Sequence, residues 1–98
     1  MKFLALEHEL PDAPAEIFQQ YSKEEALKAW ELHQAGILRE LYFRADRNEA
    51  VLVLECESVS AAHEVLSCLP FVKNHLIAFE VIPLKAYSGF ARLFAANE

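Results

Sequence analysis

The segment from residue 76 to residue 84, Leu-Ile-Ala-Phe-Glu-Val-Ile-Pro-Leu, is apolar apart from Glu80. Its branched and aromatic residues are typical of a β-strand. Because alternate side chains of a strand point to opposite faces, both faces of this strand are apolar. Residues 51–54, Val-Leu-Val-Leu, repeat the pattern and are followed by Glu55. Any fold of this chain must therefore cover two strands on both of their faces.

Helix and turn signals set the order of the elements. Strands are predicted at residues 3–9, 37–44, 50–57 and 76–84, with helices between the first and second and between the third and fourth. Gly36 ends the first helix and Ser58 caps the second. Ser22 followed by Glu25 resembles a capping box, which predicts a bend or restart of the first helix near Ser22.

The order β-α-β-β-α-β predicts an α+β, ferredoxin-like fold, in which both helices cover one face of a four-stranded antiparallel sheet. The other face is apolar here, and each aliphatic side chain left exposed on it would forfeit ~1.5–3 kcal/mol relative to full burial. The simplest cover is the same face of a second copy. We therefore expect two sheets to pair into a dimeric α+β barrel, with Glu55 and Glu80 projecting into a cavity between them.

Length and composition exclude several classes of protein. Ninety-eight residues make a single domain, spanning residues 1–98. The formal charge of −6 argues against a nucleic-acid partner, and no apolar stretch approaches the ~20 residues that span a membrane. The two cysteines, Cys56 and Cys68, form no metal-binding motif, so we expect two reduced core thiols in a cytoplasmic protein, with a disulfide between them as the alternative.

Four short segments resemble the muconolactone isomerase family of the dimeric α+β barrel superfamily, and the likeness extends over residues 2–85. These segments are residues 36–42, 53–59, 69–71 and 79–84. The resemblance implies a proton shift in a small unsaturated lactone that carries a carboxylate, without a metal or an organic cofactor. Such chemistry needs a base near the acidic C–H group and a donor at the developing enolate oxygen.

Glu80 and Glu55 are the first candidates for the catalytic acid and base. An apolar wall would raise the pKa of either carboxyl toward neutrality, and mutual repulsion in one cavity would separate the two pKa values. The alternative for each is a structural ion pair with Lys or Arg across the sheet or the dimer seam.

Four further residues are predicted to bind the substrate. Tyr42 can donate to an oxyanion or lie in an interface, and an arginine can hold the substrate carboxylate or lie on the surface at a strand end. By the resemblance Glu7 faces the cavity, and its alternative is a solvated strand end. The set is Glu7, Tyr42, Arg39 and Arg44. His8 is the one histidine that we would test as a base, and the four histidines show no metal-ligand spacing.

The segment from residue 84 to residue 98 forms an aromatic tail. It is expected to act as a lid over a cavity or as an arm in an oligomer, and its alternative is packing on the chain's own helices. The predicted function is a cofactor-independent isomerase or lyase that acts as a homodimer, with higher assembly as a further option. The alternatives are a non-catalytic metabolite-binding module and a structural dimerisation domain of the same fold.

Overall fold

The computed structural model describes residues 1–95, and its elements follow the order predicted from the sequence. The chain forms β1 (Lys2–Glu9), α1 (Ala15–Gln34), β2 (Leu38–Phe43), β3 (Ala50–Glu55), α2 (Val59–Leu66), α3 (Pro70–Lys73), β4 (Ile77–Pro83) and a final 3₁₀ helix, η1 (Gly89–Leu93). Within these residues no helix combines the length and the apolar character needed to cross a membrane.

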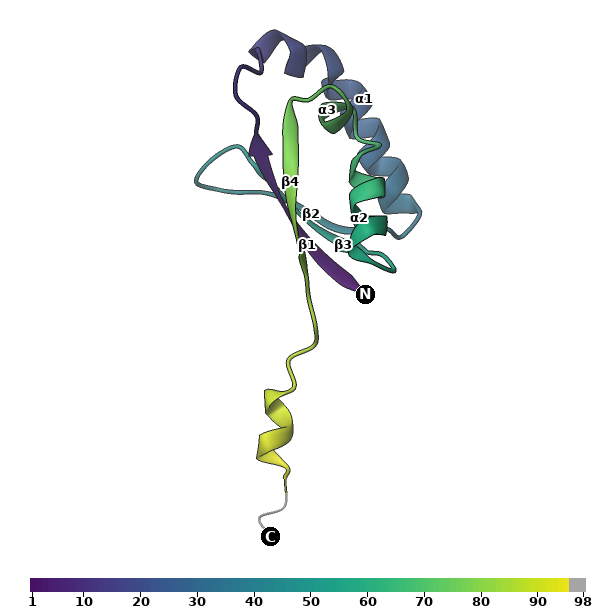
Figure 1. Ribbon diagram of the computed structural model, residues 1–98, viewed down its shortest axis with the longest axis vertical. Coiled ribbons are helices and arrows are strands. Elements are labelled where there is room, and N and C mark those ends of the chain that lie inside the picture. The colour runs from purple at the N-terminus through teal and green to yellow at the C-terminus, as the bar shows by residue number, and fades with distance from the viewer. Residues whose placement is uncertain (96–98) are drawn as a thin grey trace.

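The four strands form one sheet in the order β2-β3-β1-β4, and every neighbouring pair is antiparallel. The helices cover one face of this sheet and leave the other open (Figure 1). This arrangement confirms the predicted ferredoxin-like fold. Pairing of two sheets into a barrel involves a second chain and stays a prediction.

The core lies between the sheet and the helices. Phe3, Leu38 and Leu54 are the largest side chains that are fully buried, and Leu66 of α2 packs in the same cluster. The opposite face of the sheet carries Leu4, Leu6, Val51, Val53 and Ile82, all half-buried within the single chain. The prediction that strands β3 and β4 are apolar on both faces is confirmed.

Gly36 ends α1 as predicted. Its backbone has φ +79°, a left-handed conformation that glycine adopts without a Cβ penalty. The Gly36 N–H donates to the carbonyl of His33 at 3.1 Å, and the Ile37 N–H donates to that of Leu32 at 3.1 Å. These two bonds make a Schellman motif, which satisfies carbonyls at the helix end.

Two local predictions are wrong. Helix α1 is continuous through Ser22, whose hydroxyl donates to the Gln19 carbonyl at 3.0 Å, so no capping box or restart exists there. Glu25 instead reaches the short helix α3, where its side chain accepts the N–H of Phe71 at 2.9 Å. Cys68 is exposed rather than in the core, while Cys56 is half-buried, and both thiols are free.

The tail stands off the body of the domain (Figure 1). The chain extends over 64 Å along its longest axis, and its radius of gyration of 16.7 Å exceeds the ~13 Å expected for a compact domain of this length. Tyr87, Phe90, Leu93 and Phe94 are each at least 68% exposed. The alternative that the tail packs on its own helices is therefore wrong for residues 84–95, and residues 96–98 lie outside the described part.

Candidate functional site

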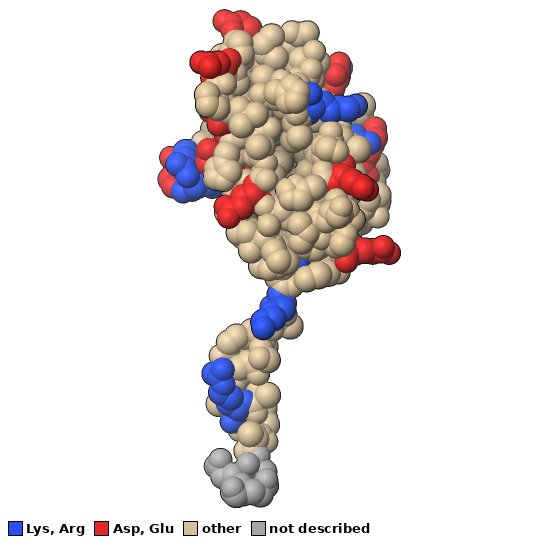
Figure 2. Space-filling view, viewed as in Figure 1, with Lys and Arg blue, Asp and Glu red and all other residues tan. Residues whose placement is uncertain are grey.

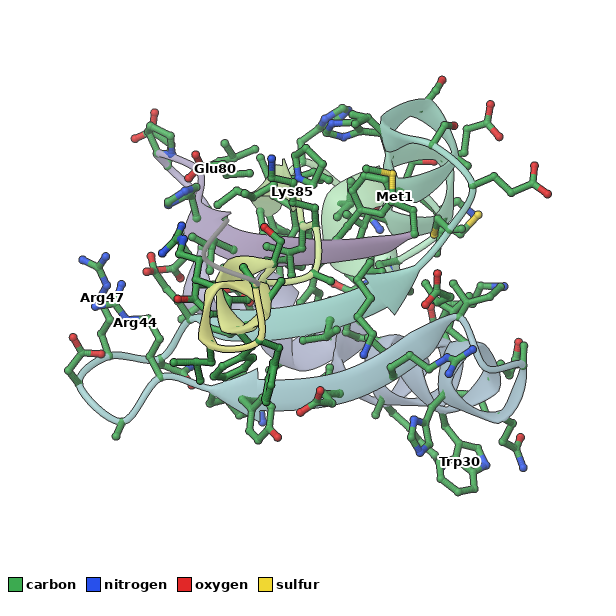
Figure 3. The ribbon with its side chains drawn as sticks, turned by 90° about the horizontal axis from the view of Figure 1, so that it is seen from below. Met1, Trp30, Arg44, Arg47, Glu80 and Lys85 are labelled. Atoms are coloured by element: carbon green, nitrogen blue, oxygen red, sulfur yellow. The ribbon has the colours of Figure 1, made fainter. Side chains whose placement is uncertain are left out.

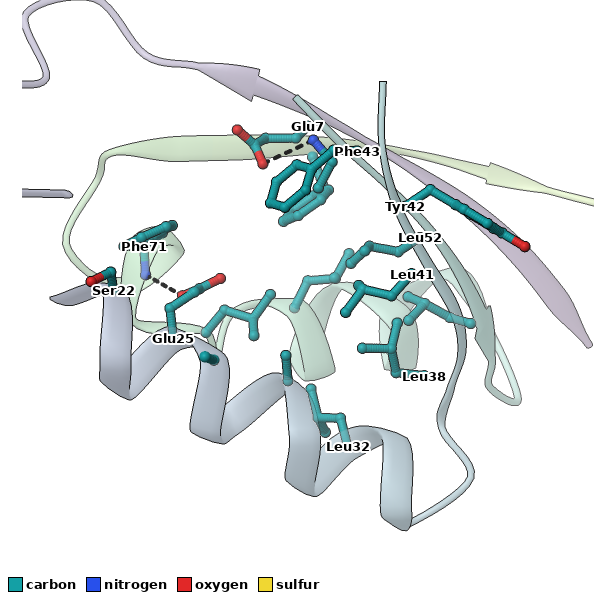
Figure 4. A pocket seen from close by; sticks show the side chains of 17 residues that line it. Glu7, Ser22, Glu25, Leu32, Leu38, Leu41, Tyr42, Phe43, Leu52 and Phe71 are labelled. Atoms are coloured by element: carbon teal, nitrogen blue, oxygen red, sulfur yellow. Dashed lines mark hydrogen bonds between the residues drawn. The ribbon is translucent and has the colours of Figure 1, made fainter. Parts of the chain in front are cut away.

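A cavity of about 400 Å³ lies between α1 and the β2–β3 side of the sheet (Figure 4). Its walls are mostly apolar. They include Ala29 and Leu32 of α1, Leu41 of β2, and Leu52 of β3. The volume falls within the range of small-molecule sites, which are typically apolar with a few polar groups. The cavity is on the helix-covered face, whereas the sequence predicted one on the open face.

Two features of the chain open this space. First, α1 presents Ser22, Ala26 and Ala29 to the cavity, so small side chains stand where a tightly packed helix would carry large ones. Second, the pairing of β2 with β3 shifts by one residue between Leu38 and Glu40. Because of this irregularity, Leu41 and Phe43 point to the helix side of the sheet. Without it, Glu40 and Tyr42 would take these places.

Two carboxylates line the cavity from opposite walls, Glu7 on β1 and Glu25 on α1 (Figure 4). Oε1 of Glu7 accepts the N–H of Ala50 at 3.1 Å, and Oε1 of Glu25 accepts the N–H of Phe71 at 2.9 Å. Each hydrogen bond orients one oxygen toward the backbone and leaves the second oxygen of that carboxyl available.

Burial raises the pKa of Glu7 and of Glu25 above the ordinary value for a glutamate. The backbone hydrogen bonds oppose this shift because they favour the charged form. For Glu25, the nearby charge of Glu7 raises the pKa further. A raised pKa makes the ionised carboxyl a stronger base and lets the protonated one keep its proton to higher pH, so the two groups are candidates for acid and base roles in one cavity.

The predicted catalytic pair, Glu80 and Glu55, is not brought together within one chain. Both lie on the open face: Glu80 is paired with Leu6 of β1, and Glu55 with Lys2. These partners are four residues apart, which is about 13 Å along a strand. The expected mutual repulsion between the two acids therefore has no basis within a single chain.

The contacts of these two acids also differ from those expected. Glu55 pairs with the α-amino group of Met1, and this contact holds the pKa of Glu55 below its usual value instead of raising it. Glu80 is 58% exposed, and its Oε1 lies 3.9 Å from Nε2 of His8. Figure 3 places Glu80 well apart from Arg44 and Arg47 of the β2–β3 turn.

The predicted binding residues divide into one inside the cavity, one at its rim and two outside. Glu7 is inside. Tyr42 lies at the rim, but its hydroxyl points away and donates to Oε1 of Glu40 at 2.7 Å (Figure 4). Arg39 donates to the Gly36 carbonyl, and Arg44 is held by Asp46 at 2.6 and 2.8 Å, so the latter guanidinium is already paired with a carboxylate.

Glu25 is the site residue that sequence reasoning missed. Its partner Phe71 is 46 residues away in the chain, so no local pattern indicates the contact. The available signal was the set of small residues on one face of the first helix, at positions 22, 26 and 29. Within residues 1–95, no group of three His, Cys, Asp or Glu side chains is arranged to hold a metal ion.

Comparison with known proteins agrees with this architecture. The family model described as muconolactone delta-isomerase matches residues 1–89. The chain belongs to this family. A solved structure of muconolactone isomerase is similar at 27% sequence identity and a TM-score of 0.74, covering 90% of this chain and 92% of the other.

A second solved structure shows the fold alone at 21% identity. It is the 5-chloro-2-hydroxyhydroquinone dehydrochlorinase of Burkholderia phenoliruptrix AC1100 in complex with 2,5-dihydroxybenzoquinone, with a TM-score of 0.66 over 91% of this chain and 98% of that one. No curated protein matches the sequence. The chain thus has the fold of the muconolactone delta-isomerase family, a fold that is shared with enzymes that act on small molecules. Within this fold it has a cavity lined by two carboxylates.

Proposed function

We propose that this protein is a cofactor-independent isomerase that moves a proton within a small unsaturated lactone or acid. The observation that carries the proposal is the pairing of Glu7 and Glu25 in one apolar cavity, each with a pKa raised by burial. Membership of the muconolactone delta-isomerase family supports the reaction class. The two free thiols support the predicted cytoplasmic setting.

We propose a different role for each carboxyl from its electrostatic surroundings. The charge of Glu7 raises the pKa of Glu25, so Glu25 keeps its proton to higher pH when Glu7 is ionised. Glu7 then acts as the base that removes a proton from the carbon next to the unsaturated system. The electron pair moves into that system, and protonated Glu25 donates a hydrogen bond to the oxygen on which charge develops. The Glu7 carboxyl returns the proton at another carbon, which completes an isomerisation.

The predicted catalytic roles of Glu80 and Glu55 require a second copy, because neither lines the cavity of the single chain. We propose that the apolar open face forms a homodimer and that these two acids belong to this interface. Sedimentation of the wild type beside Val53→Lys tests it. A dimer that becomes monomeric in the variant supports the interface, and an unchanged assembly refutes it.

The test of the proposed reaction is the initial rate of muconolactone isomerisation, followed by ultraviolet absorbance. Glu7→Gln should lower the rate at least ~100-fold, the usual size of an acid/base contribution. Glu80→Gln is the matched control, and it should retain a rate close to that of the wild type. A large loss of rate in Glu80→Gln with none in Glu7→Gln would show that the catalytic site lies on the open face of the sheet.

A non-catalytic binding module is the second candidate, because the same cavity can hold a metabolite without turnover. It predicts that muconolactone or a related acid binds to the wild type, to Glu7→Gln and to Glu80→Gln with no rate above buffer in any of them. Calorimetric titration with the same compounds separates this outcome from a protein with no affinity for them.

A further inference from the structure

Helix α3 depends on α1 for one of its contacts. It has four residues, and helices this short are not stable without tertiary contacts. Its N-cap, Leu69, has no side-chain acceptor, and Pro70 at the first position has no N–H. The N–H of Phe71 finds its acceptor on α1, where Oε1 of Glu25 lies 2.9 Å away (Figure 4). Glu25 thus serves as the missing cap of α3.

The side chain of Phe71 is held from the same face of α1. Its ring meets the ring of Phe18 edge to face, with centroids 5.2 Å apart and an angle of 75° between the planes. This is a favoured arrangement of two aromatic rings. Phe18 and Glu25 are separated by close to two turns of α1, so both point toward α3. One face of α1 thus contacts Phe71 twice, at its ring and at its main chain.

These two contacts are coupled because one residue makes both. The ring of Phe71 and its N–H are joined at a single Cα, so a shift of α3 that parts the two rings also moves the N–H away from Glu25. Ser22 lies between Phe18 and Glu25 and lines the cavity, but its hydroxyl donates to the Gln19 carbonyl at 3.0 Å. Among the described residues, the N–H of Phe71 is the donor that holds Glu25. Loss of the ring contact therefore releases the carboxyl.

We infer that Phe18 is a positioning residue for Glu25. By holding Phe71 in place, it keeps one oxygen of Glu25 on the backbone of α3 and leaves the other turned to the cavity. Phe18 acts from outside the site, because it is not among the described residues that line the cavity. The consequence for catalysis rests on the proposed function, whereas the effect of Phe18 on the Glu25 carboxyl does not.

The bond that Phe18 preserves also affects the protonation of Glu25. Burial raises the pKa of Glu25, the bond from the Phe71 N–H lowers it, and the charge of Glu7 on β1 raises it. Loss of this bond should therefore raise the pKa, so that Glu25 keeps its proton to higher pH. Acidic side chains are spread over the body of the domain (Figure 2), but this general charge stays the same when one neutral residue replaces another. A change in the Glu25 pKa between variants of Phe18 thus reports the local contact.

Nuclear magnetic resonance of the full chain tests the positioning without any substrate. The side-chain carboxyl carbon of Glu25 and the backbone amide of Phe71 are followed through a pH titration of the wild type and of Phe18→Ala. In the wild type the Phe71 amide should shift as Glu25 titrates, because the two groups are hydrogen-bonded. In Phe18→Ala the midpoint of the Glu25 titration should rise, and the Phe71 amide should no longer follow it.

Two further variants serve as controls in this experiment. Phe18→Tyr keeps the ring and should restore the wild-type titration of Glu25. Ile17→Ala removes an apolar side chain from the preceding, half-buried position of α1 and should leave the midpoint for Glu25 in place, even where it lowers the melting temperature. An unchanged midpoint in Phe18→Ala, or an equal rise in Ile17→Ala, would overturn the inference.

Kinetics test the consequence for the reaction. Phe18→Ala should lower kcat for muconolactone about tenfold or more, because a misplacement of ~1 Å can cost ~100-fold in rate. The KM should change little, since Phe18 is not among the described residues that line the cavity. The alkaline limb of the pH profile of kcat should move to higher pH, because the reaction needs protonated Glu25. Phe18→Tyr should behave as the wild type, whereas a fall in kcat without the move of the alkaline limb, or no fall, would overturn the catalytic part of the inference.

The two tests also separate the inference from the proposed function. If the midpoint for Glu25 rises in Phe18→Ala but the wild type has no isomerase activity, the proposed reaction is wrong and the positioning of Glu25 stands. If the wild type is active and the midpoint for Glu25 does not move in Phe18→Ala, the reaction stands and the role of Phe18 is wrong.

Discussion

Filling the cavity should make the protein more stable and less active. Ala29 lies on α1 and lines the space between this helix and the sheet. Ala29→Leu adds three carbon atoms to a cavity of about 400 Å³, so the added group fits without displacing the core. At ~0.8 kcal/mol per buried carbon, the free energy of unfolding should rise by about 2 kcal/mol. Ala and Leu are both strong helix formers, so a change in helix propensity contributes little.

Thermal unfolding and muconolactone kinetics together measure this effect. The melting temperature should rise by about 10 °C, given ~4–8 °C per kcal/mol for a domain of this size. The KM should rise at least ~10-fold, because the new side chain occupies space that the substrate needs. Gln20→Leu, at an exposed position of the same helix, is the control and should change neither quantity much. A more stable Ala29→Leu protein with unchanged kinetics would show that the reaction does not take place in this cavity.

Three further predictions concern stability. Glu25→Gln should be more stable than the wild type at pH 8, because a carboxyl with a raised pKa in the folded protein lowers stability as pH rises. Below about pH 4 the difference should vanish, because Glu25 is then protonated in both the folded and the unfolded protein. Equal stability of the two proteins at pH 8 would refute this prediction. Leu54→Ala should lower the free energy of unfolding by ~2–5 kcal/mol in urea titrations, because Leu54 is fully buried, and a loss below ~1 kcal/mol would contradict this packing. Gly36→Ala should cost ~1–2 kcal/mol by the same method, because alanine is strained at φ +79°, whereas an unchanged midpoint would argue against that backbone conformation.

The fold follows closely from local sequence signals. Alternation along the strands, the glycine that ends α1 and the serine that caps α2 each act over a few residues. The Ser58 side chain accepts the N–H of Ala61 at 3.0 Å, as its position before the helix predicted. The Ser22–Glu25 pattern misled, because Glu25 finds a distant backbone partner that competes with the local cap.

The site follows less closely, because it depends on contacts between distant segments. An acid within an apolar strand is a strong signal, and it led to Glu80 and Glu55, but the edge position of β4 leaves Glu80 exposed. The family resemblance placed Glu7 in the same cavity as Glu55 and Glu80, whereas its pairing with Phe79 puts it on the opposite, helix-covered face. The one-residue shift after Leu38 changes which side chains of β2 face the helices, and parity counted along the sequence cannot detect such a shift.

The central claim is that a small substrate binds between α1 and the sheet. Methyl-resolved NMR of the full chain during titration with muconolactone tests it directly. The methyl signals of Leu41 and Leu52, which line the cavity, should shift together with the backbone amides of Ala50 and Phe71, which donate to the two carboxylates. The methyl signals of Val51, Val53 and Ile82 on the open face should stay in place. Shifts confined to these open-face methyl groups would contradict the account.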